Sequence, residues 1–486
     1  MAANTIIGMP AWELSQTIQA KKISCREVMG IFLDHIDKVN PRVNAIVALQ
    51  DRSDLLRQAG EKDKALASGK PDGWLHGMPQ ATKDLEDNKG IPSTWGSLIL
   101  KDNIPRADAL MTRRIKAAGG ILVGRTNTPE FGLGSHTYNE VYGATRNPYN
   151  QALSAGGSSG GAACSVALGM LPVADGTDFM GSLRNPAGWC NVFGFRPTFG
   201  RVPGGVELFM NTFSTKGAMG RTVPDVALLL ATIAGYYPGI PLSLDNDPQL
   251  DALTPQNVCD RLKADHRGKK IGWIGDWKGY LPMEEGVIAQ CEEALRAFTR
   301  IGLTVEPLDP PMDGAEFWEE IWLPLRHFGM INQKANYEDP AKRKLLKPAV
   351  CYEYEGSEKY SARDIYAAAM KRSDFYRTVL KLFDSYAYLA VPTAQLFAFD
   401  VTLDWPKEIA GKKMDTYHRW MEVVAAWTMA DCPTIGIPAG FDAQGRSMGI
   451  QLIGKPRCDF DLLQMAYAYE LATDWVGKFP PKLLRG

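Results

Sequence analysis

Hydrophobic positions at helical spacing mark the first element of the chain. Ser24 and Glu27 have the spacing of a capping box, and apolar residues then recur every three or four positions as far as Asn40-Pro41. The pattern predicts a helix that begins after Ser24 and stops at Asn40-Pro41, because proline lacks a backbone donor. We expect residues 1–70 to form an N-terminal helical region that packs on the core.

Farther along, short apolar runs alternate with longer helical patterns. Strands are expected at 121–123, 271–274, 303–305, 388–392 and 450–454, and helices at 162–170 and 287–298. This alternation is typical of an α/β fold. We expect a single large mixed β-sheet flanked by helices on both faces, to which the C-terminal strands return.

An aromatic segment lies between the turn-rich stretch at 309–314 and Pro392. Its members are Phe317, Trp318, Trp322, Phe328, Tyr352, Tyr354, Tyr360 and Tyr366. Such residues more often form core than a binding surface, so core is the first interpretation. The alternative is a hydrophobic wall for a substrate.

Composition and charge narrow the class of protein. The hydrophobic fraction is 45% and the charged fraction 22%, which are ordinary values for a soluble globular protein. The net charge is -1 and basic runs are short, so no nucleic-acid partner is expected. No apolar run reaches the length of a membrane span, and residues 1–10 lack a signal-peptide pattern. Eight scattered cysteines without a C-x-x-C pair indicate no zinc site and suit a cytoplasmic location.

Two segments at 155–161 and 174–184 are too rich in glycine and serine for ordinary helix or strand. Glycines permit close backbone approach, so such clusters can direct N–H groups at a ligand. Phosphate is the first candidate ligand. However, Gly-Lys is nowhere followed by Ser or Thr, and neither cluster contains a G-x-G-x-x-G fingerprint.

A nucleophile elbow is the second candidate, since residues 156–160 match G-x-S-x-G around Ser158. An elbow follows an apolar strand, whereas residues 146–151 are polar and turn-like. Its base would have to be His266, His327 or His418, and a lone histidine is more often structural. This match is therefore weak.

The third candidate is a serine nucleophile at Ser182. The segment 75–84 around Lys83 resembles the lysine motif of the amidase signature family, and the two glycine-serine clusters resemble its serine signature. Further family landmarks stand in the same order along nearly the whole chain, at 124–131, 143–148, 194–201, 433–440 and 449–454. Any one motif can arise by chance, but their joint occurrence is specific.

The resemblance implies a catalytic triad. Lys83 would be the base, Ser158 a bridging serine after a cis peptide bond from Gly157, and Ser182 the nucleophile. A serine hydroxyl must lose its proton as it attacks, and a lysine accepts a proton only when it is neutral. Burial favours the neutral amine.

The resemblance also assigns residues around the nucleophile. Backbone N–H groups of Phe179, Met180, Gly181 and Ser182 would form the oxyanion hole. Ser159, Thr177, Asp178 and Arg184 would support the triad and the turn. Most family members have glycine where Met180 stands and often a smaller residue than Phe179, so a backbone with positive φ there would be strained.

Within the family, the implied activity is hydrolysis of hydrophobic or aryl amides through an acyl-serine intermediate, with carbamates and esters as related substrates. Tyr138, Trp189, Phe317 and Trp322 are the expected substrate-binding residues. No metal or organic cofactor is expected, the partner is a small-molecule amide, and homodimers are common in the family.

Two other functions remain open. The amidase subunit of a tRNA-dependent amidotransferase carries the same signature, although residues 183–186 lack the glutamine expected there after Arg184. A non-catalytic binding module could also retain the fold, although the intact triad argues against it. In either case residues 71–235 would be the signature core. Residues 236–486 would complete the same α/β domain, with a variable substrate-wall region at about 310–385.

Overall fold

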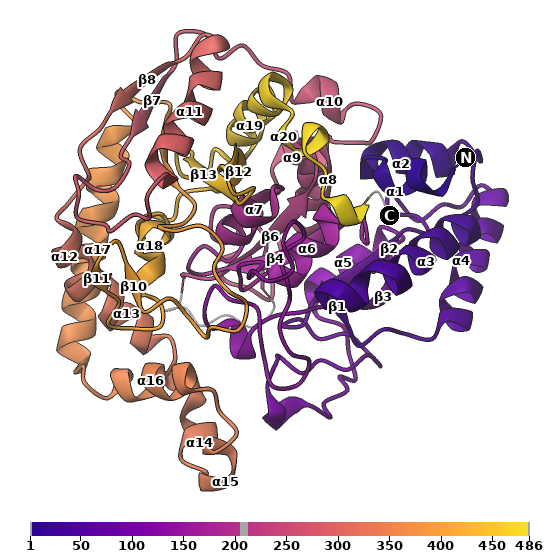
Figure 1. Ribbon diagram of the computed structural model, residues 1–486. Helices are drawn as coiled ribbons and strands as arrows, with labels where there is room; N and C mark the ends of the chain where they lie inside the picture. Colours follow the sequence, from indigo (N-terminus) through magenta and orange to yellow (C-terminus); the bar gives the residue numbers. More distant parts are fainter. Residues whose placement is uncertain (1, 205–211, 485–486) are drawn as a thin grey trace.

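The computed structural model describes residues 2–204 and 212–484, and its centre is an eight-stranded mixed sheet (Figure 1). The strand order is β4-β6-β5-β12-β13-β9-β7-β8. Neighbours are antiparallel from β4 to β9, and β9, β7 and β8 run parallel. Their bounds are β4 Val173–Asp178, β5 Phe193–Arg196, β6 Thr215–Gly220, β7 Lys270–Trp273, β8 Thr304–Pro307, β9 Tyr388–Pro392, β12 Thr434–Phe441 and β13 Ser447–Ile453. The predicted large mixed sheet is confirmed.

One predicted strand lies in a second sheet instead. β3 (Ile121–Thr126) pairs with β1 (Ile46–Val47) and β2 (Pro79–Lys83) in the order β1-β3-β2. Figure 1 shows this small sheet beside the N-terminal helices, next to the β4 end of the large sheet. β10 (Glu408–Ile409) and β11 (Lys412–Lys413) form a separate hairpin. Apolar strands carry the same pattern in either sheet, so the sequence could not assign β3 to its partners.

The N-terminal helices are α1 Ala3–Gly8, α2 Ala11–Gln19, α3 Cys25–Val43 and α4 Arg52–Ala67. The capping box at Ser24 and Glu27 is present, as predicted. The helix continues past the predicted stop at Asn40-Pro41 and contains Pro41 in its last turn, although proline has no N–H to donate to the preceding turn. The Asn40 side chain then accepts hydrogen bonds from the N–H groups of Ala45 and Ile46, and the left-handed Asn44 ends the helix.

Helices cover both faces of the large sheet. α6 (Gly160–Ala167) and α7 (Arg184–Cys190) contact each other on one face. α8 (Val223–Ile233) and α11 (Val287–Arg300) both contact α19 (Asp459–Thr473) on the other. Most buried hydrophobic side chains between Ile6 and Tyr469 form one connected cluster, and a second, small cluster contains Leu133, Met330, Val350 and Tyr417.

The segment after β8 is helical and extends to the lower left of Figure 1. Its helices are α12 Gly314–Phe317, α13 Leu323–Phe328, α14 Lys334–Tyr337, α15 Pro340–Arg343, α16 Pro348–Ser357 and α17 Ala362–Leu382. The remaining helices are α5 Leu110–Ala117, α9 Pro248–Asp251, α10 Val258–Arg261, α18 Ala425–Met429 and α20 Trp475–Lys478. Throughout 2–204 and 212–484, no helix combines the length and the apolar character that a membrane crossing requires.

Candidate active site

Lys83 is the last residue of β2, and its side chain is fully buried. Its ammonium Nζ donates to three hydroxyls, at 2.7 Å to Ser158 Oγ, 2.9 Å to Ser159 Oγ and 2.8 Å to Thr177 Oγ1. Loss of solvation lowers the pKa of Lys83 to about 7, although nearby carboxylates of Asp175, Asp178 and Glu86 oppose the shift. Near neutral pH this amine therefore exists in both charged and neutral forms.

Ser158 and Ser159 reach Lys83 from the loop that enters α6. The peptide bond from Gly157 to Ser158 is cis, as the family resemblance implied. The N–H of Ser159 donates to the carbonyl of Ser182 at 3.2 Å and so ties this loop to the nucleophile turn. Gly176 of β4 permits the approach, since a Cβ there would lie 2.7 Å from Ser159 Oγ.

The turn that carries Ser182 connects the end of β4 at Asp178 to the start of α7 at Arg184. Positive φ occurs at Gly181, at 76°, and not at Met180, so the strain considered for Met180 does not arise. Position 181 also has no room for a side chain, because a Cβ there would lie 2.8 Å from the Val424 side chain. The turn thus places its single glycine where the backbone requires one.

One predicted oxyanion donor is already occupied. The N–H of Gly181 donates to Asp178 Oδ1 at 3.0 Å, and that of Leu183 donates to Oδ2 at 3.1 Å. Within the described part of the chain, the N–H groups of Phe179, Met180 and Ser182 have no acceptor. The sequence could not show which of the four predicted amides are free to bind an oxyanion, because that depends on where the Asp178 carboxylate points.

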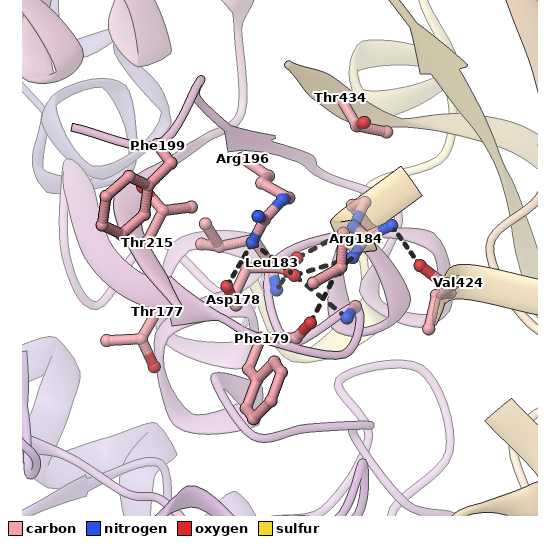
Figure 2. A network of polar contacts seen from close by, with 12 residues as sticks. Thr177, Asp178, Phe179, Leu183, Arg184, Arg196, Phe199, Thr215, Val424 and Thr434 are labelled. Atoms are coloured by element: carbon pink, nitrogen blue, oxygen red, sulfur yellow. Dashed lines mark hydrogen bonds and ion pairs between the residues drawn. The ribbon is translucent and has the colours of Figure 1, made fainter. Parts of the chain in front are cut away.

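Asp178 is the centre of a buried polar network, shown in Figure 2 between Arg184 and Arg196. Arg184 donates to its carboxylate from Nε at 2.9 Å and from Nη2 at 2.7 Å, and Arg196 Nη1 donates to its carbonyl oxygen. Burial alone would raise the pKa of the Asp178 carboxyl, but the two guanidinium groups hold it far below its ordinary value. The carboxylate is permanently charged.

Arg184 extends this network to residues from the C-terminal part of the sequence. Its Nη1 donates to Val424 O at 2.9 Å and to Gln451 Oε1 at 2.6 Å, while Nη2 donates to Thr428 Oγ1 at 3.1 Å. Thr428 in turn donates to the carbonyl of Phe179 at 2.6 Å. One side chain therefore fixes both ends of the turn.

A cavity of about 110 Å³ opens beside Ser182. Its apolar walls are Leu85, Phe131, Leu133, Phe179, Met180, Met330 and Met421, and its polar walls include Ser158, Thr177, Ser214, Arg326, Tyr417 and His418. It shares Leu85, Phe131, Thr177 and Ser214 with a larger hollow of about 590 Å³. The site is thus a narrow, mostly apolar pocket that continues into a wider space.

The predicted substrate-binding aromatics do not line this cavity. Trp189 is buried and stacks on Trp420, and Phe317 packs on Phe375, so both are core residues. Trp322 is buried behind the cavity wall, with its ring centre 5.7 Å from that of Phe179. Tyr138 lines a neighbouring cavity of about 230 Å³, which shares Gly134 and Tyr417 with the first.

The residues that sequence reasoning missed come from segments without a motif. Arg326 belongs to α13, and Tyr417 and His418 precede a short 3-10 helix at Arg419–Val424. His418 is buried, and neither ring nitrogen has a hydrogen-bond partner in the described structure. Burial lowers the pKa of His418 to about 3, so the ring is neutral. The sequence contained no signal that distinguished it from the other histidines.

Comparisons with known proteins agree with this geometry. The protein-family model described as "Amidase" matches residues 27–463. An acylamidase of Rhodococcus erythropolis is 31% identical, over 99% of this chain and 98% of that protein. A glutamyl-tRNA(Gln) amidotransferase subunit from a Cyanothece species is 33% identical, over 96% and 98%. The crystal structure of a bacterial aryl acylamidase of the amidase signature family superposes with a TM-score of 0.88 at 29% identity, over 98% of both chains.

Proposed function

The chain belongs to the amidase signature family, and from that premise we propose that it hydrolyses small hydrophobic or aryl amides through an acyl-Ser182 intermediate. The observation that supports this most strongly is the setting of Lys83. A buried amine surrounded by hydroxyls, one of them the bridging Ser158, is a proton acceptor at neutral pH.

In the proposed reaction, neutral Lys83 takes the proton of Ser158 as Ser158 takes the proton of Ser182. The Ser182 oxygen attacks the carbonyl carbon, and the resulting oxyanion accepts hydrogen bonds from the N–H groups of Phe179, Met180 and Ser182. The proton returns through Ser158 to the leaving nitrogen as the C–N bond breaks. Water then hydrolyses the acyl ester by the same relay and releases the acid.

The cavity supports the proposed substrate class. Its apolar walls are leucine, phenylalanine and methionine, which favour an apolar acyl or aryl group over a small polar one such as glutamine. The aryl acylamidase relative is named for aryl amides, and the Rhodococcus relative is named an acylamidase. Carbamates and esters have the same electrophilic carbonyl and extend the proposal.

The alternative is the amidase subunit of a tRNA-dependent amidotransferase, which the Cyanothece relative favours. Leu183-Arg184-Asn185 lacks the glutamine expected after the arginine. Incubation with glutamine, alone and with the other amidotransferase subunits, separates the two functions. Release of ammonia from glutamine that requires those subunits would replace our proposal.

The direct test uses 4-nitroacetanilide, whose hydrolysis releases a coloured amine. We expect Ser182→Ala to lower kcat by roughly 10⁴-fold to 10⁶-fold, because the nucleophile is removed. A fluorophosphonate probe should label the wild type and not this variant. Ser165→Ala is the matched control, since Ser165 is equally buried but its hydroxyl has no described partner. Full hydrolysis by Ser182→Ala would refute the mechanism.

A further inference from the structure

Arg326 places a buried guanidinium in the wall of the Ser182 cavity. Its side chain is 4% exposed and lies on α13. Two of its three nitrogens are used, since Nε donates to Glu353 Oε1 at 2.9 Å and Nη2 donates to Tyr417 Oη at 2.8 Å. Nη1 makes no hydrogen bond to any described residue. One strong donor therefore remains available at the cavity.

The orientation of this donor is fixed from two sides. The guanidinium lies over the Phe179 ring, with its central carbon 4.5 Å from the ring centre. This contact occupies a face of the guanidinium, and only the in-plane N–H groups remain for hydrogen bonds. Phe179 begins the turn that carries Ser182, and Arg326 and Ser182 line the same cavity.

The charge of Arg326 is already balanced. Glu353 is fully buried on α16, and His327 Nδ1 lies 2.9 Å from its second oxygen. Burial alone would raise the pKa of the Glu353 carboxyl, but Arg326 holds it well below its ordinary range. An anionic ligand would add an unbalanced negative charge to this buried pair, whereas a neutral acceptor would not.

We propose that Arg326 Nη1 donates a hydrogen bond to a second, uncharged oxygen of the substrate, so that this enzyme selects amides with a neutral acceptor beyond the scissile carbonyl. The inference rests on the proposed function and names a substrate class within it. Arg326 is then a specificity-determining residue, because an analogue without the acceptor leaves a buried donor unpaired.

The test compares substrates that differ by one oxygen. On the acyl side, methoxyacetyl 4-nitroanilide is paired with butanoyl 4-nitroanilide. On the amine side, 3-methoxyacetanilide is paired with 3-ethylacetanilide. We expect wild type to prefer the oxygen member of at least one pair by roughly tenfold to hundredfold in kcat/KM.

The double variant R326M/E353Q removes both charges and so leaves neither buried alone. For this variant, the ratio of kcat/KM between the oxygen member and the hydrocarbon member of a pair should fall to about one. Because both values come from the same variant, a general loss of activity does not affect this ratio. R326K serves as the test if the double variant does not fold. It keeps the charge but lacks the planar fork, so it should also lower the ratio. Arg372→Met is the matched control, because Arg372 lies 4.7 Å over Phe213, which stacks on Phe179, yet does not line the cavity. It should keep the preference.

The outcomes separate the two proposals. If the wild-type protein hydrolyses no member of either pair and is not labelled by the fluorophosphonate probe, the proposed function is overturned. Hydrolysis without preference in either pair, or a preference that survives R326M/E353Q and R326K, would overturn the role of Arg326. Faster hydrolysis of succinanilic acid than of both oxygen members, abolished by R326K, would replace the neutral acceptor with a carboxylate.

Discussion

Two fully buried cations stand on either side of the Ser182 turn, and their surroundings differ. Arg184 has the Asp178 carboxylate at 2.7 Å and donates to three further acceptors. Lys83 contacts three hydroxyls, and in the described structure no carboxylate lies within 4.0 Å of Nζ. The first cation is compensated by a carboxylate in direct contact, while the second is free to lose its proton near neutral pH.

The difference shows that burial alone does not decide what a charged side chain does. Desolvation acts on both groups, but a carboxylate in direct contact offsets it only at Arg184. A compensated buried charge stabilises structure, and an uncompensated one is available for chemistry. Activity and stability should therefore respond differently when each cation is removed.

The largest expected effect is the loss of activity in Lys83→Met. Without the proposed base, kcat should fall by roughly 10⁴-fold or more, as for other members of a catalytic triad. The free energy of unfolding, measured by urea denaturation, should change by no more than about 1 kcal/mol, because an uncompensated buried amine is removed. A large loss of stability together with retained activity would make Lys83 a structural residue.

Arg184→Met should lower the stability of the protein far more than Lys83→Met does. Removing one partner of a buried ion pair leaves the Asp178 carboxylate with only the more distant Arg196 guanidinium, at 3.5 Å, and such a loss costs about 3–5 kcal/mol of unfolding free energy. Urea denaturation followed by tryptophan fluorescence measures the loss. Arg52→Met is the control, because its pairs with Asp34 and Asp37 are exposed and contribute less than about 1 kcal/mol. Equal effects of the two variants would contradict the comparison.

The smallest expected effect concerns pH. The neutral amine of Lys83 is the active form, so kcat/KM should rise as pH increases through about 7. Thr177 accepts a hydrogen bond from the charged form, and removing that acceptor lowers the pKa further. In Thr177→Val, the acid limb of the pH profile, where kcat/KM rises with pH, should therefore move to lower pH by about half a unit to one unit.

Thr126→Val serves as the matched control for this shift. Thr126 pairs with Lys83 across β2 and β3, and its buried hydroxyl has no partner in the described structure. Its acid limb should remain where it is in wild type. A limb that moves to higher pH in Thr177→Val would mean that the hydroxyl favours the neutral amine.

The sequence predicted the parts of the site that lie within continuous motifs. Lys83, Ser158 and Ser182 each stand in a short segment with a recognisable pattern, and the structure brings Lys83 and Ser158 into contact. Arg326 and His418 belong to segments with no such pattern. Their position depends on how α13 and the loop at 414–418 pack, which is a tertiary property and has no local signature.

Two of the four expected substrate-binding aromatics lie in the core, for a related reason. Trp189 and Phe317 are core residues, whereas Met330 and Met421 line the cavity. Hydrophobic character is the same on the inside of a core and on the wall of a pocket. Composition therefore indicated an apolar site without identifying which apolar residues form it.

The two sheets meet at the proposed catalytic groups. Lys83 ends a strand of the three-stranded sheet, Ser182 follows a strand of the eight-stranded sheet, and the N–H of Lys83 donates to Asp175 Oδ2 of β4 at 3.1 Å. Neither sheet contains both base and nucleophile. In a folding chain, a reactive serine would thus exist only after the sheets dock, so reactivity towards an acylating reagent is a measure of assembly rather than of secondary structure.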